Sequence, residues 1–177
     1  MKIIETPRLI LRTWKQEDAQ SYLAMNNDPK VVEFLRGTMN LSEVNVFINA
    51  MNIQSDQKGY TLWATELKET GEMIGFIGLN FIDFAAHFAP AVEIGWRLGS
   101  QYWGKGYATE GALASLDFGF NQAGLSEIVA ITVPVNTRSR AVMEKIGMKH
   151  DLAGDFAHPK LASDHPLSRH LLYRISK

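Results

Sequence analysis

Cysteine is absent from this chain of 177 residues. Without a thiol, the protein can form no disulfide, no thiolate metal site and no cysteine nucleophile. The absence fits a reducing compartment, and the N-terminal residues lack the long apolar core of a signal peptide. We therefore expect a cytoplasmic protein.

Long apolar runs and an excess of charge of one sign are also missing. Asn, Asp or Gly interrupts the longest apolar runs well short of a membrane span, so we expect no membrane partner. Lys and Arg number 18 and Asp and Glu number 19, and the formal net charge of −1 gives no global field that favours nucleic acid. The 5 histidines show no spacing typical of metal ligands, so no metal is expected.

The order of predicted strands and helices is mixed. The length and the hydrophobic content of 46% indicate one domain over residues 1–177, either monomeric or a homodimer. Antiparallel hairpins dominate the first half, and one β-α-β-α unit follows, which is typical of an α+β fold. Gly75 and Gly78 inside one strand indicate a bulge or a close backbone approach, and Ser42 is expected to cap the third helix. The predicted strands are 8–13, 60–67, 73–81, 91–98, 127–133, 148 onward and 169–175, and the predicted helices are 15–26, 28–37, 42–58, 107–123 and 136–146.

The segment from Glu93 to Ala108 is the most informative part of the sequence. It is predicted to form a strand, a tight glycine turn and the start of a helix. Such a turn places backbone N–H groups at the positive end of a helix dipole, where a phosphate can bind. Gly104 and Gly106 lack Cβ atoms and let an anion approach the backbone closely. The segment therefore predicts a site for a phosphorylated ligand, although an ordinary strand-to-helix turn is the plain alternative.

Three kinds of phosphorylated ligand compete for this turn. A P-loop needs Ser or Thr after its Gly-Lys pair, and here Gly106 follows Lys105. A dinucleotide fold carries its glycines after the first strand and an acid at the end of the next one. Here the glycines lie past residue 100, and residues 133–136 contain no acid. The third ligand is coenzyme A, whose pyrophosphate needs a helix N-terminus and whose pantetheine amides can pair with a strand edge.

The spacing Gln101-x-x-Gly104-x-Gly106-x-Ala108 resembles the acetyl-CoA motif of the GNAT acetyltransferase superfamily. The resemblance implies a three-layer α/β/α fold with a mixed central sheet of about seven strands. It also implies an antiparallel N-terminal half and a splayed parallel pair at the acetyl-CoA site. Four further segments resemble the branch that contains the ribosomal-protein N-terminal (alanine/serine) acetyltransferases: residues 5–12, 27–31, 136–148 and 170–173.

The activity that the resemblance implies is transfer of an acetyl group from acetyl-CoA to a primary amine. The amine attacks directly in a ternary complex, so no covalent enzyme intermediate is required. The branch favours a protein N-terminal α-amine as the acceptor, and a small-molecule amine is the alternative. A catalytically weak acyl-CoA-binding regulatory relative is a third possibility, because residues 139–147 lack the Tyr that many relatives use as general acid.

The resemblance also implies which residues bind the cofactor. Backbone N–H groups of residues 101–108 would hold the pyrophosphate, and Arg97 and Lys105 would add charge unless Lys105 is merely a solvated turn residue. A backbone N–H of residues 96–98 would polarise the thioester carbonyl, worth ~3 kcal/mol in the transition state. Asn136 would bind the pantetheine arm or serve only as a turn residue. The predicted cofactor-binding residues are Trp96, Arg97, Leu98, Gln101, Gly104, Lys105, Gly106, Tyr107, Ala108, Asn136 and Ser139.

Glu93 is the predicted general base. A carboxylate beside the thioester site can take a proton from the acceptor ammonium, directly or through water; a salt-bridged strand residue is the alternative. Ser139 would give a proton to the leaving thiolate, or would cap its helix locally. Asp83, Asp155 and His158 are weaker candidates that lie in loops.

The acceptor site is expected to lie among loops, which vary freely between related proteins. The loops in question are residues 36–41, 84–90 and 153–168. Aromatic side chains are more often core residues, but four are candidates to line an acceptor pocket: Phe81, Phe84, Phe88 and Phe156.

Overall fold

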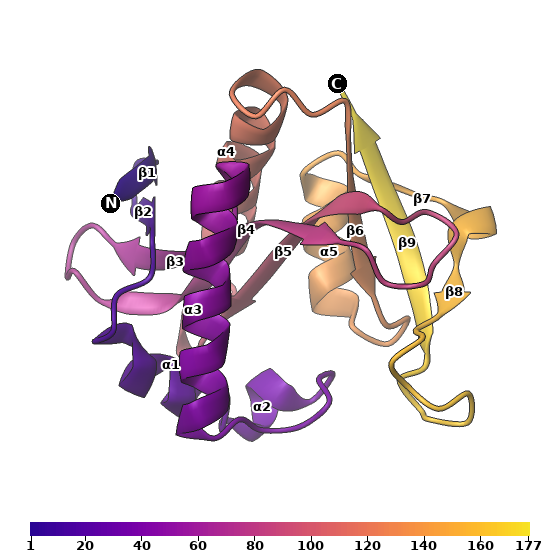
Figure 1. The fold of residues 1–177 in the computed structure, drawn as a ribbon, viewed down its shortest axis with the longest axis horizontal. Coiled ribbons are helices and arrows are strands. Elements are labelled where there is room, and N and C mark those ends of the chain that lie inside the picture. Colours follow the sequence, from indigo (N-terminus) through magenta and orange to yellow (C-terminus); the bar gives the residue numbers. More distant parts are fainter.

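The computed structural model describes all residues 1–177 and is built around one mixed sheet (Figure 1). The 9 strands run in the order β1-β2-β3-β4-β5-β6-β9-β7, with β8 paired to β9. The strands are β1 (Lys2–Glu5), β2 (Leu9–Arg12), β3 (Leu62–Leu67), β4 (Met73–Ile82), β5 (Ala91–Leu98), β6 (Glu127–Thr132), β7 (Lys149–His150), β8 (Phe156–Ala157) and β9 (Arg169–Ser176). The helices are α1 (Asp18–Met25), α2 (Pro29–Val32), α3 (Leu41–Lys58), α4 (Tyr107–Asn121) and α5 (Thr137–Lys145), with 3-10 turns η1 (Ser100–Tyr102) and η2 (Leu152–Gly154).

The strand pairing confirms the predicted α+β class. Strands β1 to β5 are antiparallel neighbours, β5 and β6 are parallel, and β6 and β9 are antiparallel. The sheet has two strands beyond the predicted set, β1 and β8. They have 4 and 2 residues, too few for a period-two pattern to be recognised, and they form because β2 and β9 offer free edges.

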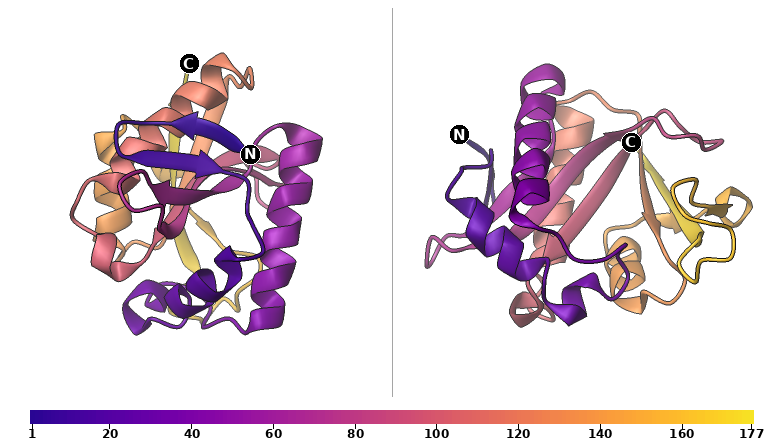
Figure 2. Two further views of the ribbon diagram at one scale, coloured as in Figure 1. Left: turned by 90° about the vertical axis from the view of Figure 1, so that its left-hand side faces the viewer. Right: turned by 60° about the horizontal axis from the view of Figure 1, so that its bottom comes forward.

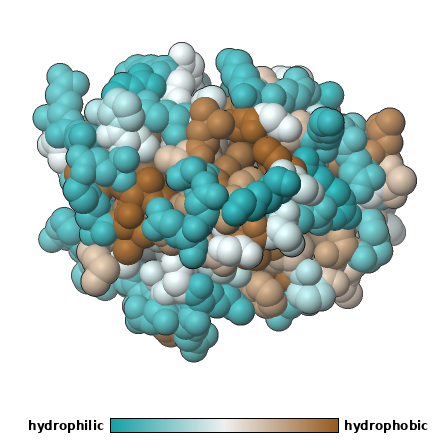
Figure 3. All heavy atoms as spheres, turned by 90° about the horizontal axis from the view of Figure 1, so that it is seen from above, coloured by the Kyte–Doolittle hydropathy of each residue, from teal (hydrophilic) through white to brown (hydrophobic).

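Helices cover both faces of the sheet and give the predicted three layers (Figure 2). On one face α1 and α3 pack against β3 and β4, around Tyr22, Ile48 and Phe76. On the other face α4 and α5 pack on a larger core that includes Ile77 and Ile128. None of the helices combines the length and hydropathy that a membrane-spanning helix needs. Seen from above, apolar side chains reach the surface in patches among polar ones (Figure 3).

Small residues allow α4 to lie close to the sheet. A Cβ added at Gly111 would come within 2.4 Å of Ile77 Cδ1, and one added at Gly119 within 2.7 Å of Ile128 Cδ1. Since real Cβ atoms do not approach this closely, a side chain at either position would force the facing isoleucine or the helix to shift. The helix that begins at the glycine turn is thereby held directly against β4 and β6.

The structure corrects two helix boundaries. Asn40, not Ser42, caps α3: its side chain accepts from the Glu43 N–H, and the Glu43 carboxylate accepts from the Asn40 N–H. This reciprocal capping box satisfies two N–H groups, which the Ser42 hydroxyl alone could not do. Asp28 caps α2 as predicted, but α2 ends at Val32 instead of near Gly37.

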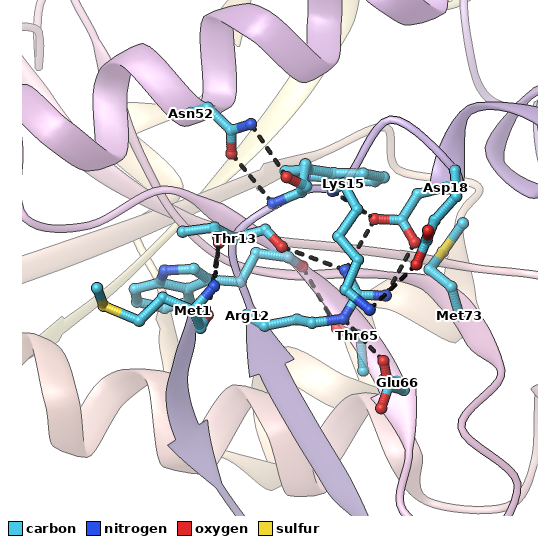
Figure 4. A network of polar contacts seen from close by, with 12 residues as sticks. Met1, Arg12, Thr13, Lys15, Asp18, Asn52, Thr65, Glu66 and Met73 are labelled. Atoms are coloured by element: carbon cyan, nitrogen blue, oxygen red, sulfur yellow. Dashed lines mark hydrogen bonds and ion pairs between the residues drawn. The ribbon is translucent and has the colours of Figure 1, made fainter.

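A buried ionic network fastens α1 to the sheet (Figure 4). The Arg12 guanidinium of β2 donates to both carboxylate oxygens of Asp18 on α1, each at 2.8 Å. Its Nε donates to Glu66 of β3, also at 2.8 Å. The side chains of Arg12 and Asp18 are only 7% and 3% exposed, so each charge depends on its partners for solvation.

Replacing Asp18 by Asn should lower the free energy of unfolding by about 3 kcal/mol, because the buried guanidinium loses one of its two carboxylates. Urea unfolding followed by circular dichroism measures the change. Glu17→Gln removes an exposed carboxylate paired with Lys15 and is the matched control, expected to be close to wild type. Equal changes in the free energy of unfolding for the two substitutions would show that the buried network stabilises the fold no more than an exposed ion pair does.

Candidate active site

Strands β5 and β6 separate almost as soon as they pair. β5 pairs with β4 along its whole length, from Ala91 to Leu98. With β6 it shares a single register pair, Glu93 opposite Val129. Beyond Glu93 the edge of β5 that faces β6 therefore has no strand partner, and a gap opens in the sheet.

Backbone groups of β5 point into this gap. The Gly99 N–H donates to the Ile74 carbonyl at 3.0 Å, which sets the phase of the β4–β5 ladder. Because hydrogen-bonding groups alternate along an antiparallel pair, the groups of Trp96 and Leu98 face away from β4. The Trp103 indole N–H donates to the Leu98 carbonyl at 2.8 Å. The N–H groups of Trp96 and Leu98 remain for a ligand.

The glycine turn leaves a row of N–H groups without acceptors in the protein. Gly104 and Gly106 have φ values of 75° and 82°, a left-handed conformation that favours glycine. The Glu110 N–H donates to the Gly106 carbonyl, whereas those from Gly104 to Thr109 have no protein acceptor. A Cβ at Gly104 would meet no atom within 4 Å, so the space before the helix is open. The turn thus has the backbone groups and the room that an anion needs.

A contact between distant segments holds the turn in place, and no pattern in the sequence predicts it. Arg8 Nε donates to Glu110 Oε2 at 2.6 Å, and Arg8 Nη1 donates to the Lys105 carbonyl at 2.9 Å. The Thr6 hydroxyl also donates to Glu110, at 2.6 Å. These bonds draw the Lys105 carbonyl toward Arg8 and connect the first turn of α4 to the segment before β2.

Two adjacent cavities lie along the gap. The first, of about 380 Å³, follows the glycine turn and the start of α5. The second, of about 240 Å³, contains Glu93 and Ile131, and the two share lining residues such as Trp96 and Ser139. Nine of the predicted cofactor-binding residues line the first cavity: Trp96, Arg97, Leu98, Gly104, Gly106, Tyr107, Ala108, Asn136 and Ser139.

Two predicted cofactor residues lie outside these walls, and the side chain of Arg97, which is one of the nine, points elsewhere. Gln101 and Lys105 are exposed and line neither cavity. The Arg97 guanidinium donates to Asn26 Oδ1 at 2.6 Å and to the Tyr22 hydroxyl at 3.4 Å, both on or next to α1. The charge of Arg97 is therefore directed at α1. Arg97 contributes to the wall of the cavity only through its position on β5.

Glu93 is a partly buried carboxylate in the second cavity. It lies opposite Asn80 on β4. Burial raises its pKa to about 7, against hydrogen bonds from the Asn80 side chain and the Ile131 backbone that lower it. A carboxyl group with this pKa exchanges a proton near neutral pH.

Asn136 and Ser139 lie together at the start of α5. The Asn136 side chain accepts from the Ser139 N–H at 3.1 Å and so caps the helix. The Ser139 hydroxyl has no hydrogen-bond partner within the protein and lines both cavities. The cap is therefore made by Asn136, and the serine hydroxyl is left for a ligand.

Two of the weaker base candidates lie away from the cavities. Burial raises the pKa of Asp155, but hydrogen bonds from His150 and the Leu172 N–H outweigh it and hold the pKa below its usual range. Asp83 is exposed in the β4–β5 loop. Neither carboxylate lines either cavity.

The aromatic candidates divide into two groups. Phe84, Phe88 and Phe156 pack against one another, with ring centroids 4.9 to 6.2 Å apart, and His158 joins them. Phe81 is separate and lies under the ammonium group of Lys58, 3.7 Å from its ring centroid.

Arg138 crosses the first cavity and was missed from the sequence. From α5 it donates to Glu33, which follows α2, at 2.8 Å. Its guanidinium lies 4.5 Å from the Trp103 ring and 5.8 Å from the Phe34 ring. The side chain thereby joins three segments around the cavity, a role that only their proximity in space reveals.

Comparisons with known proteins agree with this geometry. The family model of the acetyltransferase (GNAT) domain matches residues 8–149. The chain is 32% identical over 163 residues to the uncharacterized N-acetyltransferase p20 of Bacillus licheniformis, with 90% of each chain covered.

Solved structures show the same fold. An acetyltransferase from Agrobacterium tumefaciens str. C58 is 29% identical with a TM-score of 0.80, over 100% of this chain and 95% of that one. RimJ from Mycobacterium smegmatis, in complex with CoA-disulfide, is 23% identical with a TM-score of 0.74, over 95% of this chain and 81% of that one.

The raised pKa of Glu93 predicts a pH-dependent stability. The folded protein holds this proton up to about pH 7, whereas an unfolded chain releases it near the ordinary value of 4.5. The stabilisation is complete below 4.5 and is lost as the pH rises through about 7. Relative to Glu93→Gln, which cannot titrate, the wild-type free energy of unfolding should fall by about 2 kcal/mol between pH 5 and pH 8. Parallel curves for the two proteins in urea titrations would contradict the raised pKa.

Proposed function

The chain belongs to the GNAT acetyltransferase family, and from this premise we propose that it transfers the acetyl group of acetyl-CoA to a primary amine beside Glu93. The observation that carries the proposal is the position of Glu93. It is the one carboxylate that lines either cavity, and it lies where β5 and β6 begin to separate. The acceptor is a protein N-terminal α-amine or a small-molecule amine that enters the second cavity.

The residues of the gap suit coenzyme A in their chemistry. The N–H groups from Gly104 to Thr109 would bind the pyrophosphate at the positive end of α4. The N–H groups of Trp96 and Leu98 would hold the pantetheine arm and the thioester carbonyl. The Asn136 amide nitrogen has no partner in the protein and would add a donor to the arm. Acetyl-CoA itself supplies the activated acetyl group.

Glu93 would accept the proton that the acceptor must lose before it attacks. An α-amino group has a pKa of about 7.7–8.0, close to the value of about 7 for Glu93. The transfer is therefore nearly balanced in energy, which is the condition for an efficient general base. A backbone N–H at Trp96 aimed at the developing oxyanion contributes about 3 kcal/mol in sites of this kind.

Ser139 would hold the proton for the leaving thiolate. Helix α5 contains no Tyr, and Ser139 lines both cavities with a hydroxyl that has no partner in the protein. A hydroxyl there can donate to the sulfur position while Asn136 keeps the start of the helix in place.

The catalytic proposal is tested by release of free CoA thiol with a panel of peptide N-termini, polyamines, amino sugars and lysine peptides. We expect turnover with at least one class and a kcat/KM that rises as the pH passes through about 7, where the Glu93 carboxylate forms. Glu93→Gln should lower kcat by about 100-fold or more and remove the component of the rise near pH 7, leaving only the titration of the acceptor amine, while CoA affinity stays unchanged. Tight CoA binding without turnover of any amine would favour a regulatory acyl-CoA-binding protein instead.

The proposed pyrophosphate site is tested by Gly104→Asp, with Gly71→Asp as the control. Both glycines have similar φ values, 75° and 73°, and open space around the position of a Cβ, so backbone strain is matched. Only at Gly104 does the new carboxylate enter the proposed phosphate site. We expect CoA affinity in calorimetry to fall by about tenfold or more for Gly104→Asp alone. Equal affinities of the two variants would reject the site.

A further inference from the structure

Five half-buried rings form a cluster on the loops beside the second cavity. We call Phe84, Phe88, Phe156, His158 and His170 the aromatic cluster. They come from the β4–β5 loop, from β8 and the residue that follows it, and from β9. Neighbouring ring centroids lie 4.9 to 6.2 Å apart. Each ring remains partly exposed, so the cluster presents an aromatic surface to solvent.

The aromatic cluster adjoins the wall of the cavity that holds Glu93. Ile131 lines that cavity, and Ile131, Phe84 and Phe88 all pack against the same small buried cluster of Ile82, Val129 and Leu172. On β9, Leu172 lies opposite Ile131, and His170, two residues away, shares its face of the sheet. Figure 1 shows the β4–β5 loop reaching over the sheet toward β8. The face of the sheet that carries Glu93 therefore continues beneath the cluster.

The histidines of the cluster are uncharged at neutral pH. Burial lowers the pKa of both rings, and His170, Arg36 and Lys160 lower that of His158 further. His158 Nδ1 accepts from the Lys160 N–H at 3.2 Å, while His170 Nδ1 lies 3.1 Å from the Ser168 carbonyl and must donate. Each ring thus keeps a free Nε2, and no carboxylate belongs to the cluster.

A second aromatic group in the same protein shows what purely structural packing looks like. Trp14, Tyr22, Phe47 and Phe76 stack between α1, α3 and the sheet. Three of these rings are at least 90% buried, and Tyr22 is fully buried. In the aromatic cluster no ring reaches that burial, although three of its five rings are phenylalanines. The exposed ring faces are therefore available to a ligand.

On the basis of the proposed function, we infer that the acceptor is a primary amine with an aromatic or bulky apolar group a few bonds from its nitrogen. The amine lies at Glu93, and the apolar group crosses Ile131 and packs on the aromatic cluster. Burial of a phenyl ring against such rings gives affinity both from area and from ring-to-ring contact.

The inference is tested with phenylalaninamide and alaninamide as acceptors. The two share the α-amine and the terminal amide and differ by one phenyl ring. With saturating acetyl-CoA, we expect kcat/KM for phenylalaninamide to be about tenfold or more higher, mostly through a lower KM. Equal values for the two amides would overturn the inference and leave the proposed function standing.

Two variants test whether the preference for phenylalaninamide arises at the aromatic cluster. Phe156→Leu removes a ring from the aromatic cluster, and Phe81→Leu makes the same change at the separate ring that lies under Lys58. We expect the ratio of the two kcat/KM values to fall toward one in Phe156→Leu and to stay at the wild-type value in Phe81→Leu, with CoA affinity unchanged in both. If neither variant loses the preference, or if both lose it equally, the role of the aromatic cluster is contradicted.

A binding measurement separates the inference from the proposed function. Calorimetry of the CoA-loaded wild-type protein should show tighter binding of phenylalaninamide than of alaninamide, whether or not either is acetylated. Absence of acetyl transfer to every amine would contradict the proposed function alone. Equal affinities in calorimetry would overturn the inference alone.

Discussion

The structure depends on one constraint, the separation of two parallel strands after a single register pair. β5 and β6 meet at Glu93 and Val129 and then diverge. Backbone groups that a continuous sheet would pair are left at the edge of β5, and unpaired groups in a protein interior are costly without a partner. A ligand with amides of its own can supply that partner, so the gap is both a cost to the fold and the basis of the proposed binding site.

Other parts of the molecule keep the gap open. On one face α4 lies close to the sheet through Gly111 and Gly119, which fixes where the glycine turn ends. On the other face the Arg12 network holds α1, and α1 in turn holds Arg97 through Tyr22. β5 is thus held next to α1 through Arg97 and pairs with β4 along its whole length, whereas it pairs with β6 only at Glu93. The cavities are consequences of this arrangement.

Several features of the fold and of the candidate site follow from local sequence patterns. The glycine turn and the carboxylate on the strand before it could both be read from short segments, because backbone conformation and amphipathic period are local properties. The bond from Arg8 to Glu110 could not, since it joins residues 102 positions apart. The direction of the Arg97 side chain and the bridge made by Arg138 also depend on where α1 and α2 lie. The short strands β1 and β8 exist only as partners of neighbouring edges.

Amide hydrogen exchange with and without CoA tests the central claim most directly. The N–H groups of Trp96, Leu98 and the stretch from Gly104 to Thr109 have no acceptor in the protein alone. If the gap and the turn hold the cofactor, these amides exchange more slowly when CoA is bound. The α3 amides, none of which belongs to a residue that lines either cavity, keep their rates. CoA binding that leaves the rates of these gap and turn amides unchanged would contradict the account.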